Sequence, residues 1–150
     1  MTKLVYLRLS NNRISDIKPL AGMTKLELGL NLSNNQISDI KPLSRMTKLK
    51  TYLNLSNNQI SDIKPLSRMT KLWFLNLSNN RISDIKPLEG LTKLQQLRLN
   101  QNQITDIKPL EGLTWLHLLW IDQNPIEDIA LIQRLRREKP HLGVDIQIDP

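Results

Sequence analysis

The chain of 150 residues contains no cysteine, and its aromatic residues are limited to three Trp, two Tyr and one Phe. The absence of cysteine excludes a disulfide framework, a thiolate metal site and a cysteine nucleophile. Hydrophobic residues nevertheless make up 39% of the chain. A single domain of this length must therefore build its core from Leu and Ile rather than from aromatic rings.

Long apolar segments are also missing. No window reaches the roughly 18 consecutive apolar residues of a membrane helix, and the N-terminal sequence MTKLVYLRLS lacks the basic stretch and apolar run of a signal peptide. We therefore expect a soluble protein, with no signal peptide or transmembrane segment in this chain. Its compartment stays open, because a chain without cysteine can fold in either redox environment.

What the chain does contain is a repeated segment. The sequence ISDIKPL begins at Ile14, Ile37, Ile60 and Ile82, and it returns as ITDIKPL at Ile104 and as IEDIALI at Ile126. Successive copies start 23, 23, 22, 22 and 22 residues apart. Each unit follows the pattern L-x-x-L-x-L-x-x-N-x-I-x-D-I-x-P-L, which predicts an array of similar structural units.

Each unit combines a strand pattern with a tight return. Leu75 and Leu77 alternate with Phe74, Asn76 and Ser78, a period of two that predicts a short strand with one apolar face. The proline of each I-K-P-L segment lacks an N–H donor and fixes φ, which favours a 3₁₀ or extended return path over a long α-helix. One unit cannot bury its own apolar face, so stacking must create the core.

This pattern resembles the leucine-rich-repeat family, and within it the 22-residue type of bacterial internalins and of the protein-phosphatase-1 regulator. The resemblance covers about residues 2–130. It implies an α/β solenoid: a right-handed superhelix, or horseshoe, with a parallel concave β-sheet, a 3₁₀ or extended convex side and a C-terminal helical cap. It also implies that residues on the concave face bind protein partners.

Two polar columns follow the repeat. They consist of Asn12, Asn35, Asn58, Asn80, Asn102 and Asn124, and of Asp16, Asp39, Asp62, Asp84, Asp106 and Asp128. We expect the Asn side chains to bond backbone groups that the turn after each strand leaves unpaired. We expect the Asp side chains to cap the turn that follows them. A calcium ladder is the alternative for the Asp column, but one carboxylate per repeat supplies too few ligands.

No constellation of catalytic residues stands apart from the repeat. His117 and His141 are isolated, and the repeated Ser residues have no partner base. The sequence also lacks a paired-carboxylate site and a phosphate-binding glycine loop. We therefore expect no enzymatic activity, no cofactor, no metal site and no small-molecule substrate.

The formal net charge of +7 raises the question of a nucleic-acid partner. The lysines form two columns, namely Lys18, Lys41, Lys64, Lys86 and Lys108, and Lys3, Lys25, Lys48, Lys71 and Lys93. Both columns lie away from the outward strand positions, and the first runs beside the Asp column. We expect a solvated flank rather than a phosphate-binding groove, and no nucleic-acid or membrane partner.

Repeats two and three each contain one additional residue, near Glu27–Leu28 and Lys50–Thr51. The following L-N-L-S-N-N is preserved, so we expect a bulge before the strand to absorb the extra residue. The segment LSNNQISDIKPLSRMTKL occurs at both Leu32 and Leu55 without a single change. Such near-identity favours a consensus-derived or engineered repeat protein.

The two ends differ from the repeats. We expect six repeats over 1–126 and a cap over 127–150, where Ile129, Ile132 and Leu135 have helical spacing before Pro140. Beyond it, Val144, Ile146 and Ile148 alternate as in a strand. No helical segment precedes the first strand, so Val5, Tyr6, Leu7, Arg8 and Leu9 are predicted to form an unpaired edge. We predict homodimer formation through this edge.

Outward strand positions supply the candidate binding residues. Those of repeats four to six are Phe74, Asn76, Gln96, Arg98, Leu118, Trp120 and Asp122, and they include residue types that dominate binding energy at interfaces. The alternative for Leu118 and Trp120 is packing under the C-terminal cap. Trp73 and Trp115 lie nearer the start of the strands, and we expect them to be packing residues.

Two functional interpretations remain. In the first, the chain is a non-enzymatic scaffold, engineered or consensus-derived, and built for its architecture or for protein binding. In the second, it is a fragment of a natural bacterial recognition domain whose concave face in repeats four to six binds a protein or peptide partner.

Overall fold

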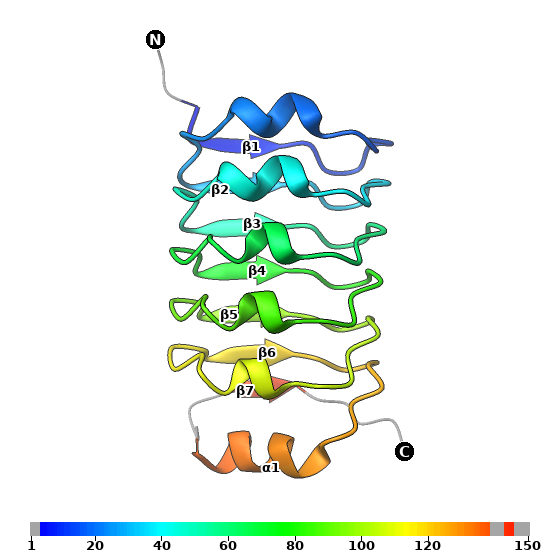
Figure 1. The fold of residues 1–150 in the computed structure, drawn as a ribbon, viewed down its shortest axis with the longest axis vertical. Helices are drawn as coiled ribbons and strands as arrows, with labels where there is room; N and C mark the ends of the chain where they lie inside the picture. The colour runs from blue at the N-terminus through cyan, green and yellow to red at the C-terminus, as the bar shows by residue number, and fades with distance from the viewer. Residues whose placement is uncertain (1–3, 139–142, 146–150) are drawn as a thin grey trace.

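The computed structural model describes residues 4–138 and 143–145. In this part of the chain, seven short strands form one parallel sheet in sequence order (Figure 1). The strands are β1 (Tyr6–Arg8), β2 (Gly29–Asn31), β3 (Tyr52–Asn54), β4 (Phe74–Asn76), β5 (Gln96–Arg98), β6 (Leu118–Trp120) and β7 (Gly143–Asp145). The first six come from successive repeats, which confirms the predicted parallel sheet of a solenoid.

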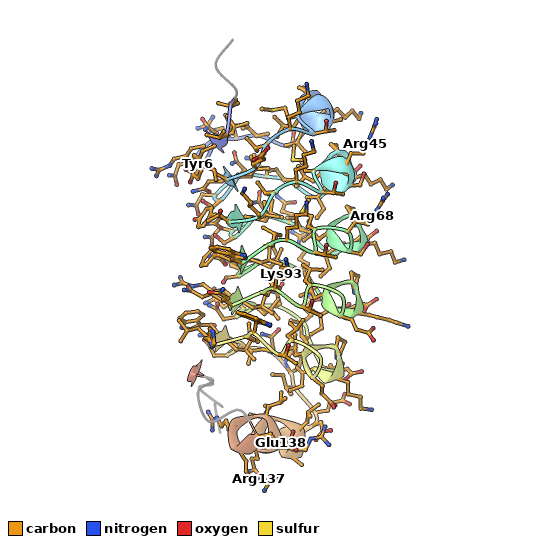
Figure 2. All side chains as sticks on the ribbon, turned by 90° about the vertical axis from the view of Figure 1, so that its left-hand side faces the viewer. Tyr6, Arg45, Arg68, Lys93, Arg137 and Glu138 are labelled. Carbon is orange, nitrogen blue, oxygen red and sulfur yellow. The ribbon has the colours of Figure 1, made fainter. Side chains whose placement is uncertain are left out.

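Short 3₁₀ helices return the chain between strands on the opposite side. They are η1 (Lys18–Gly22), η2 (Lys41–Arg45), η3 (Lys64–Leu66), η4 (Lys86–Leu88) and η5 (Lys108–Leu110). Each starts with Lys-Pro, so the missing N–H of proline falls in the first turn, where a helix has no acceptor for it. Figure 2 shows the strands along the inner side of the molecule and the 3₁₀ turns along the outer side. The predicted convex side is confirmed.

Leu and Ile side chains fill the space between the sheet and the 3₁₀ helices as one continuous core. Leu53, Leu75 and Leu97 occupy paired strand positions and are fully buried. No aromatic side chain is among the buried core residues of the described chain. The core is therefore aliphatic throughout, and each unit covers the apolar face of the next.

The Asn column forms the expected ladder along the core. In repeat four, Asn80 Nδ2 donates to the carbonyls of Leu55 (3.0 Å) and Leu77 (3.1 Å). Its Oδ1 accepts the N–H of Ile60 at 3.0 Å. One side chain thus pairs backbone groups of two successive repeats, which confirms the structural interpretation of this column.

The Asp column caps the 3₁₀ helices. Asp84 Oδ1 accepts the N–H of Lys86 at 2.9 Å, and the same bond, with the same length, recurs in the four other repeats that contain a 3₁₀ helix. Asp128 instead accepts the N–H of Leu131 at 2.8 Å, in the first turn of α1. The predicted capping role is confirmed.

Sequence reasoning did not single out the residue before each ladder Asn. These residues are Asn11, Asn34, Asn57, Asn79, Gln101 and Gln123, and their φ angles lie between 53° and 60°. Asn tolerates this left-handed conformation better than other non-glycine residues. The Asn-Asn pairs of the first four repeats therefore combine a turn residue with a ladder residue.

The additional residue of repeats two and three leaves the strand register intact. Tyr6 pairs with Gly29, and Gly29 pairs with Tyr52. The extra residue therefore lies before the strand, near Leu28 and Thr51, as expected. The apolar set keeps facing the core in both repeats.

A bulge-like pairing is nevertheless not specific to the longer repeats. The carbonyl of Trp73 accepts two consecutive N–H groups, from Gln95 (2.9 Å) and Gln96 (3.1 Å). In repeat three, Lys50 and Thr51 each accept one N–H group from repeat four, at 2.9 and 3.0 Å. The additional residue thus supplies a second carbonyl acceptor where a 22-residue unit shares one.

Helix α1 (Ile129–Glu138) closes the C-terminal end of the core. Its buried residues are Leu131, Ile132 and Leu135. The helical spacing of Ile129, Ile132 and Leu135 is confirmed, and Ile129, at the first position of the helix, is 36% exposed. Strand β7 pairs in parallel with β6 and extends the sheet. Pro140, Ile146 and Ile148 lie outside the described residues.

Candidate functional site

The side chains that point away from the core form three rows across the sheet, here called the concave face. The rows are Tyr6, Gly29, Tyr52, Phe74, Gln96 and Leu118; Arg8, Asn31, Asn54, Asn76, Arg98 and Trp120; and Ser10, Ser33, Ser56, Ser78, Asn100 and Asp122. Strand pairing aligns the first two rows residue by residue. The structure therefore brings the predicted binding residues of repeats four to six onto adjacent strands.

In repeats two to four, the Asn side chains of the second row form hydrogen bonds within their own repeat. Asn31 Oδ1 accepts both the N–H (3.0 Å) and the Oγ–H (2.8 Å) of Ser33. The same arrangement recurs with Asn54 and with Asn76 in the next two repeats. Asn76 was a candidate binding residue, but only 8% of it is exposed. Its Oδ1 already accepts hydrogen bonds from Ser78, so Asn76 stabilises the turn after β4.

Aromatic rings cover the first row on its N-terminal side. The rings of Tyr52 and Phe74 are stacked, with centroids 4.7 Å apart and planes 8° apart. Tyr6 reaches across β2 to Tyr52, with a centroid separation of 6.3 Å. Gly29 makes this possible, because a Cβ at residue 29 would lie 2.5 Å from the Tyr6 ring.

Arg98 continues the aromatic row toward the C-terminus. Its guanidinium carbon lies 5.9 Å from the centroid of Phe74 and 4.4 Å from that of Trp120. Both distances are within the range of a cation–π contact. Ring–ring and cation–π contacts therefore link five side chains across the sheet, here called the aromatic row: Tyr6, Tyr52, Phe74, Arg98 and Trp120.

Packing under the C-terminal cap was the alternative role for Trp120. The structure pairs Trp120 with Asp145 of β7 on one side and places Arg98 over its ring on the other. Trp120 and Leu118 are both half-buried. Sequence reasoning identified both residues but missed the sandwich around Arg98, whose only sequence signal is an Arg between aromatic residues of neighbouring repeats.

Trp73 and Trp115 were expected to be packing residues, and this expectation was wrong. Their side chains are 50% and 61% exposed. Both line a cavity of about 390 Å³ on the flank of the molecule, beside Lys93. The aliphatic core is complete without them, so the repeat leaves these two indoles on the surface.

The described residues contain no group of three or more His, Asp or Glu side chains that could hold a metal ion. Within the same part of the chain, no helix is both long enough and apolar enough to cross a membrane.

Sequence comparison gives the family of this repeat. Residues 29–68, 51–90, 70–110 and 92–133 match the family described as Leucine Rich repeats (2 copies), and residues 3–23 match the Leucine Rich Repeat family. The chain belongs to the leucine-rich-repeat family. None of the curated proteins compared with this leucine-rich-repeat chain matches it.

Solved structures of internalins from Listeria monocytogenes share the fold of this leucine-rich-repeat protein. An internalin, InlF, is 36% identical over 98% of this chain, with a TM-score of 0.85. Internalin C2 is 32% identical over 97% of it, with a TM-score of 0.72. The functional domain of InlJ is 27% identical over 82% of it, also with a TM-score of 0.72.

The leucine-rich-repeat chain is shorter than each of these structures. It covers 43% of the InlF chain, 74% of the internalin C2 chain and 26% of the InlJ chain. The similarity therefore concerns less than half of the InlF and InlJ chains and about three quarters of the internalin C2 chain.

Proposed function

We propose that this leucine-rich-repeat protein is a non-enzymatic recognition domain that binds a protein or peptide partner on the concave face of repeats four to six. The observation that carries the proposal is the position of Arg98, whose guanidinium group lies between Phe74 and Trp120. Arg and Trp are enriched among the residues that dominate interface energies. The sheet places both side chains on adjacent strands of one face.

Preorganisation makes this cluster suitable for recognition. A free Arg side chain loses rotamer entropy on binding, at a cost of about 0.5–1.5 kcal/mol. The rings on both sides of Arg98 already restrict its side chain, although the residue remains exposed to solvent. A partner can therefore meet a guanidinium group and an indole whose positions change little on binding.

The surroundings of this cluster match those of a binding centre. Gln96 and Leu118 are half-buried, and Asp122 adds a carboxylate in the third row. Seven strands at a spacing of about 4.8 Å make a face roughly 29 Å wide. That width suits an extended peptide or one face of a small domain, at the lower end of specific interfaces.

A comparative pull-down tests the proposal. The bait is the wild-type chain, the Arg98→Ala/Trp120→Ala double variant, or a control variant with Lys86→Ala/Lys108→Ala on the convex side. We expect a protein that is retained by the wild type and the control and is lost from the double variant, because truncating a central Arg and Trp removes more than about 2 kcal/mol of binding energy.

The same experiment decides between this function and an architectural scaffold. An engineered or consensus-derived origin is supported by the 18 residues that repeats two and three share without change. A scaffold without a partner would retain no protein whose binding depends on Arg98 and Trp120. Equal retention by all three baits would contradict recognition through repeats four to six.

A further inference from the structure

A second surface lies on the flank of the molecule, at the N-terminal ends of β4, β5 and β6. It is a cavity of about 390 Å³, here called the flank cavity, lined by Trp73, Thr92, Lys93, Gln95, Thr114 and Trp115. None of these residues belongs to the three rows of the concave face. Lys93 marks this flank in Figure 2, where it faces the viewer.

The two indoles of the flank cavity break the repeat pattern. Trp115 stands where preceding repeats have a lysine, namely Lys25, Lys48, Lys71 and Lys93. An exposed ammonium group is fully hydrated at this position, whereas Trp115, which is 61% exposed, leaves more than half of the roughly 150–250 Å² of an aromatic side chain uncovered. Trp73 stands where repeat three has Thr51. Two exposed indoles bordering one cavity indicate a binding surface, because a ligand that covers them removes apolar area from water and lowers the free energy.

Three lining side chains of the flank cavity can only donate hydrogen bonds. Lys93 brings three N–H donors and each indole brings one, whereas Gln95 and the two threonines can both donate and accept. No carboxylate lines the cavity. None of the six lining side chains makes a hydrogen bond or an ion pair with another residue of the described chain. The matching ligand therefore has apolar rings and unpaired acceptors, and it carries no positive charge.

We propose that the flank cavity binds a proline-rich segment in the polyproline II conformation. Such a segment has no internal hydrogen bonds, so its carbonyl groups are free to accept from the cavity. Proline lacks a backbone N–H donor, so its carbonyl is its only main-chain polar group and matches the N–H groups of Lys93 and the indoles. Its ring offers an apolar face to an indole, which is how aromatic-lined grooves recognise such segments.

The spacing of the two indoles fits this ligand. Measured across the sheet alone, Trp73 before β4 and Trp115 before β6 lie two strand spacings apart, or about 10 Å. Prolines at positions i and i+3 lie on one side of the helix, about 9 Å apart, because it rises about 3.1 Å per residue with three residues per turn. Trp115 stands two positions earlier in its repeat than Trp73. Because the two residues also differ in position along the strands, the segment is expected to cross the strands obliquely, with prolines at least one turn, or about 9 Å, apart contacting the two indoles.

Two other ligand classes fit less well. A sugar presents many hydroxyl donors, for which the lining side chains offer acceptors only on Thr92, Gln95 and Thr114. A cationic ligand such as a methylated lysine would meet Lys93, which is exposed within the lining. Cellohexaose represents the sugar class in the test.

The test titrates the chain with a decaproline peptide and follows tryptophan fluorescence, with isothermal calorimetry as a second measurement. Comparison ligands are a Gly-Ser decapeptide and cellohexaose. Trp115→Lys and Trp73→Thr install residues that other repeats carry at the same positions, so both variants are expected to fold as the wild type does. Arg98→Ala is the control on the concave face.

We expect decaproline to bind in the millimolar range or tighter, and the Gly-Ser peptide and cellohexaose not to bind. Each indole variant should weaken binding roughly tenfold or more, whereas Arg98→Ala should leave it unchanged. Absence of decaproline binding, equal binding by the indole variants, or binding of cellohexaose in its place would overturn the proposal. Because Arg98 is intact in the indole variants, failure here leaves recognition on the concave face to its own experiment.

Discussion

The ring of Tyr6 occupies the space above Gly29 that a side chain would otherwise fill. A Cβ at residue 29 would lie 2.5 Å from two carbons of this ring and 3.3 Å from Tyr52 Cβ. The absence of a side chain at Gly29 in β2 thus lets the ring of Tyr6 reach that of Tyr52 across one strand. This relationship links the N-terminal repeat to the aromatic row.

Gly29→Ala is expected to force the Tyr6 ring away, since this side chain is 43% exposed and free to rotate outward. The loss of ring contact should offset the gain from replacing a glycine in a strand, which is about 0.5–1 kcal/mol. In a Tyr6→Ala background more of that gain should appear, since only the contact with Tyr52 Cβ at 3.3 Å then opposes it. Urea unfolding of the four chains in a double-mutant cycle measures the coupling. Additive effects of the two substitutions would show that the ring does not depend on Gly29.

Asn80→Ala is expected to lower the free energy of unfolding by about 1–3 kcal/mol, because it leaves the buried N–H of Ile60 without its acceptor. It also removes one of the two side-chain donors that bond each of the carbonyls of Leu55 and Leu77, while Asn58 and Asn102 retain the other. Ser83→Ala, at an exposed position of the same repeat, should change stability by less than about 0.5 kcal/mol. Equal stabilities of the two variants in urea would refute the structural role of the Asn ladder.

Gln101→Asn is expected to raise the free energy of unfolding by about 0.5 kcal/mol, because Asn adopts the left-handed conformation at lower cost than Gln. Gln101 has a φ of 58°, and repeats one to four have Asn at this position. The matched control is Gln103→Asn, since Gln103 has no positive φ. Thermal unfolding should separate the two variants, and a lower melting temperature for Gln101→Asn would count against this explanation.

Self-association through residues Val5 to Leu9 stays a prediction. Strand β1 is the outermost strand of the described sheet, and Leu4, Val5 and Tyr6 are exposed beside it. We expect the apparent mass in sedimentation equilibrium to rise with concentration. Val5→Lys should abolish this rise, since charged residues on an edge oppose pairing. Val5→Thr should not. A strict monomer at high concentration would rule the prediction out.

The repeat made much of the fold predictable. The period of two in L-x-L, the proline after Ile-Lys, and the Asn and Asp columns each act over a few residues, so their consequences hold in every unit. The ladder of Asn80 and the cap by Asp84 accordingly follow the prediction in detail. The spacing of Ile129, Ile132 and Leu135 predicted the helix but not that Ile129 stays exposed, since burial depends on how the helix packs against the last repeat.

The candidate site was predictable only as a set of outward positions. Alternation places Phe74, Arg98 and Trp120 on one face whatever their chemistry. It does not tell that Asn76 is buried by its own turn, or that Trp73 and Trp115 border a cavity. The first outcome depends on the side-chain hydrogen bonds of Asn76 to Ser78 in its own repeat, and the second on the packing of repeats one and two strands away.

The sequence by itself determined the solenoid, its parallel sheet and its aliphatic core, because a repeated local pattern has one way to bury its apolar face. Only the tertiary structure decided what the surface offers. Tyr6 lies over Gly29, Arg98 lies between two rings, and two indoles stand at the flank cavity, because each side chain takes the space that the neighbouring repeats leave open.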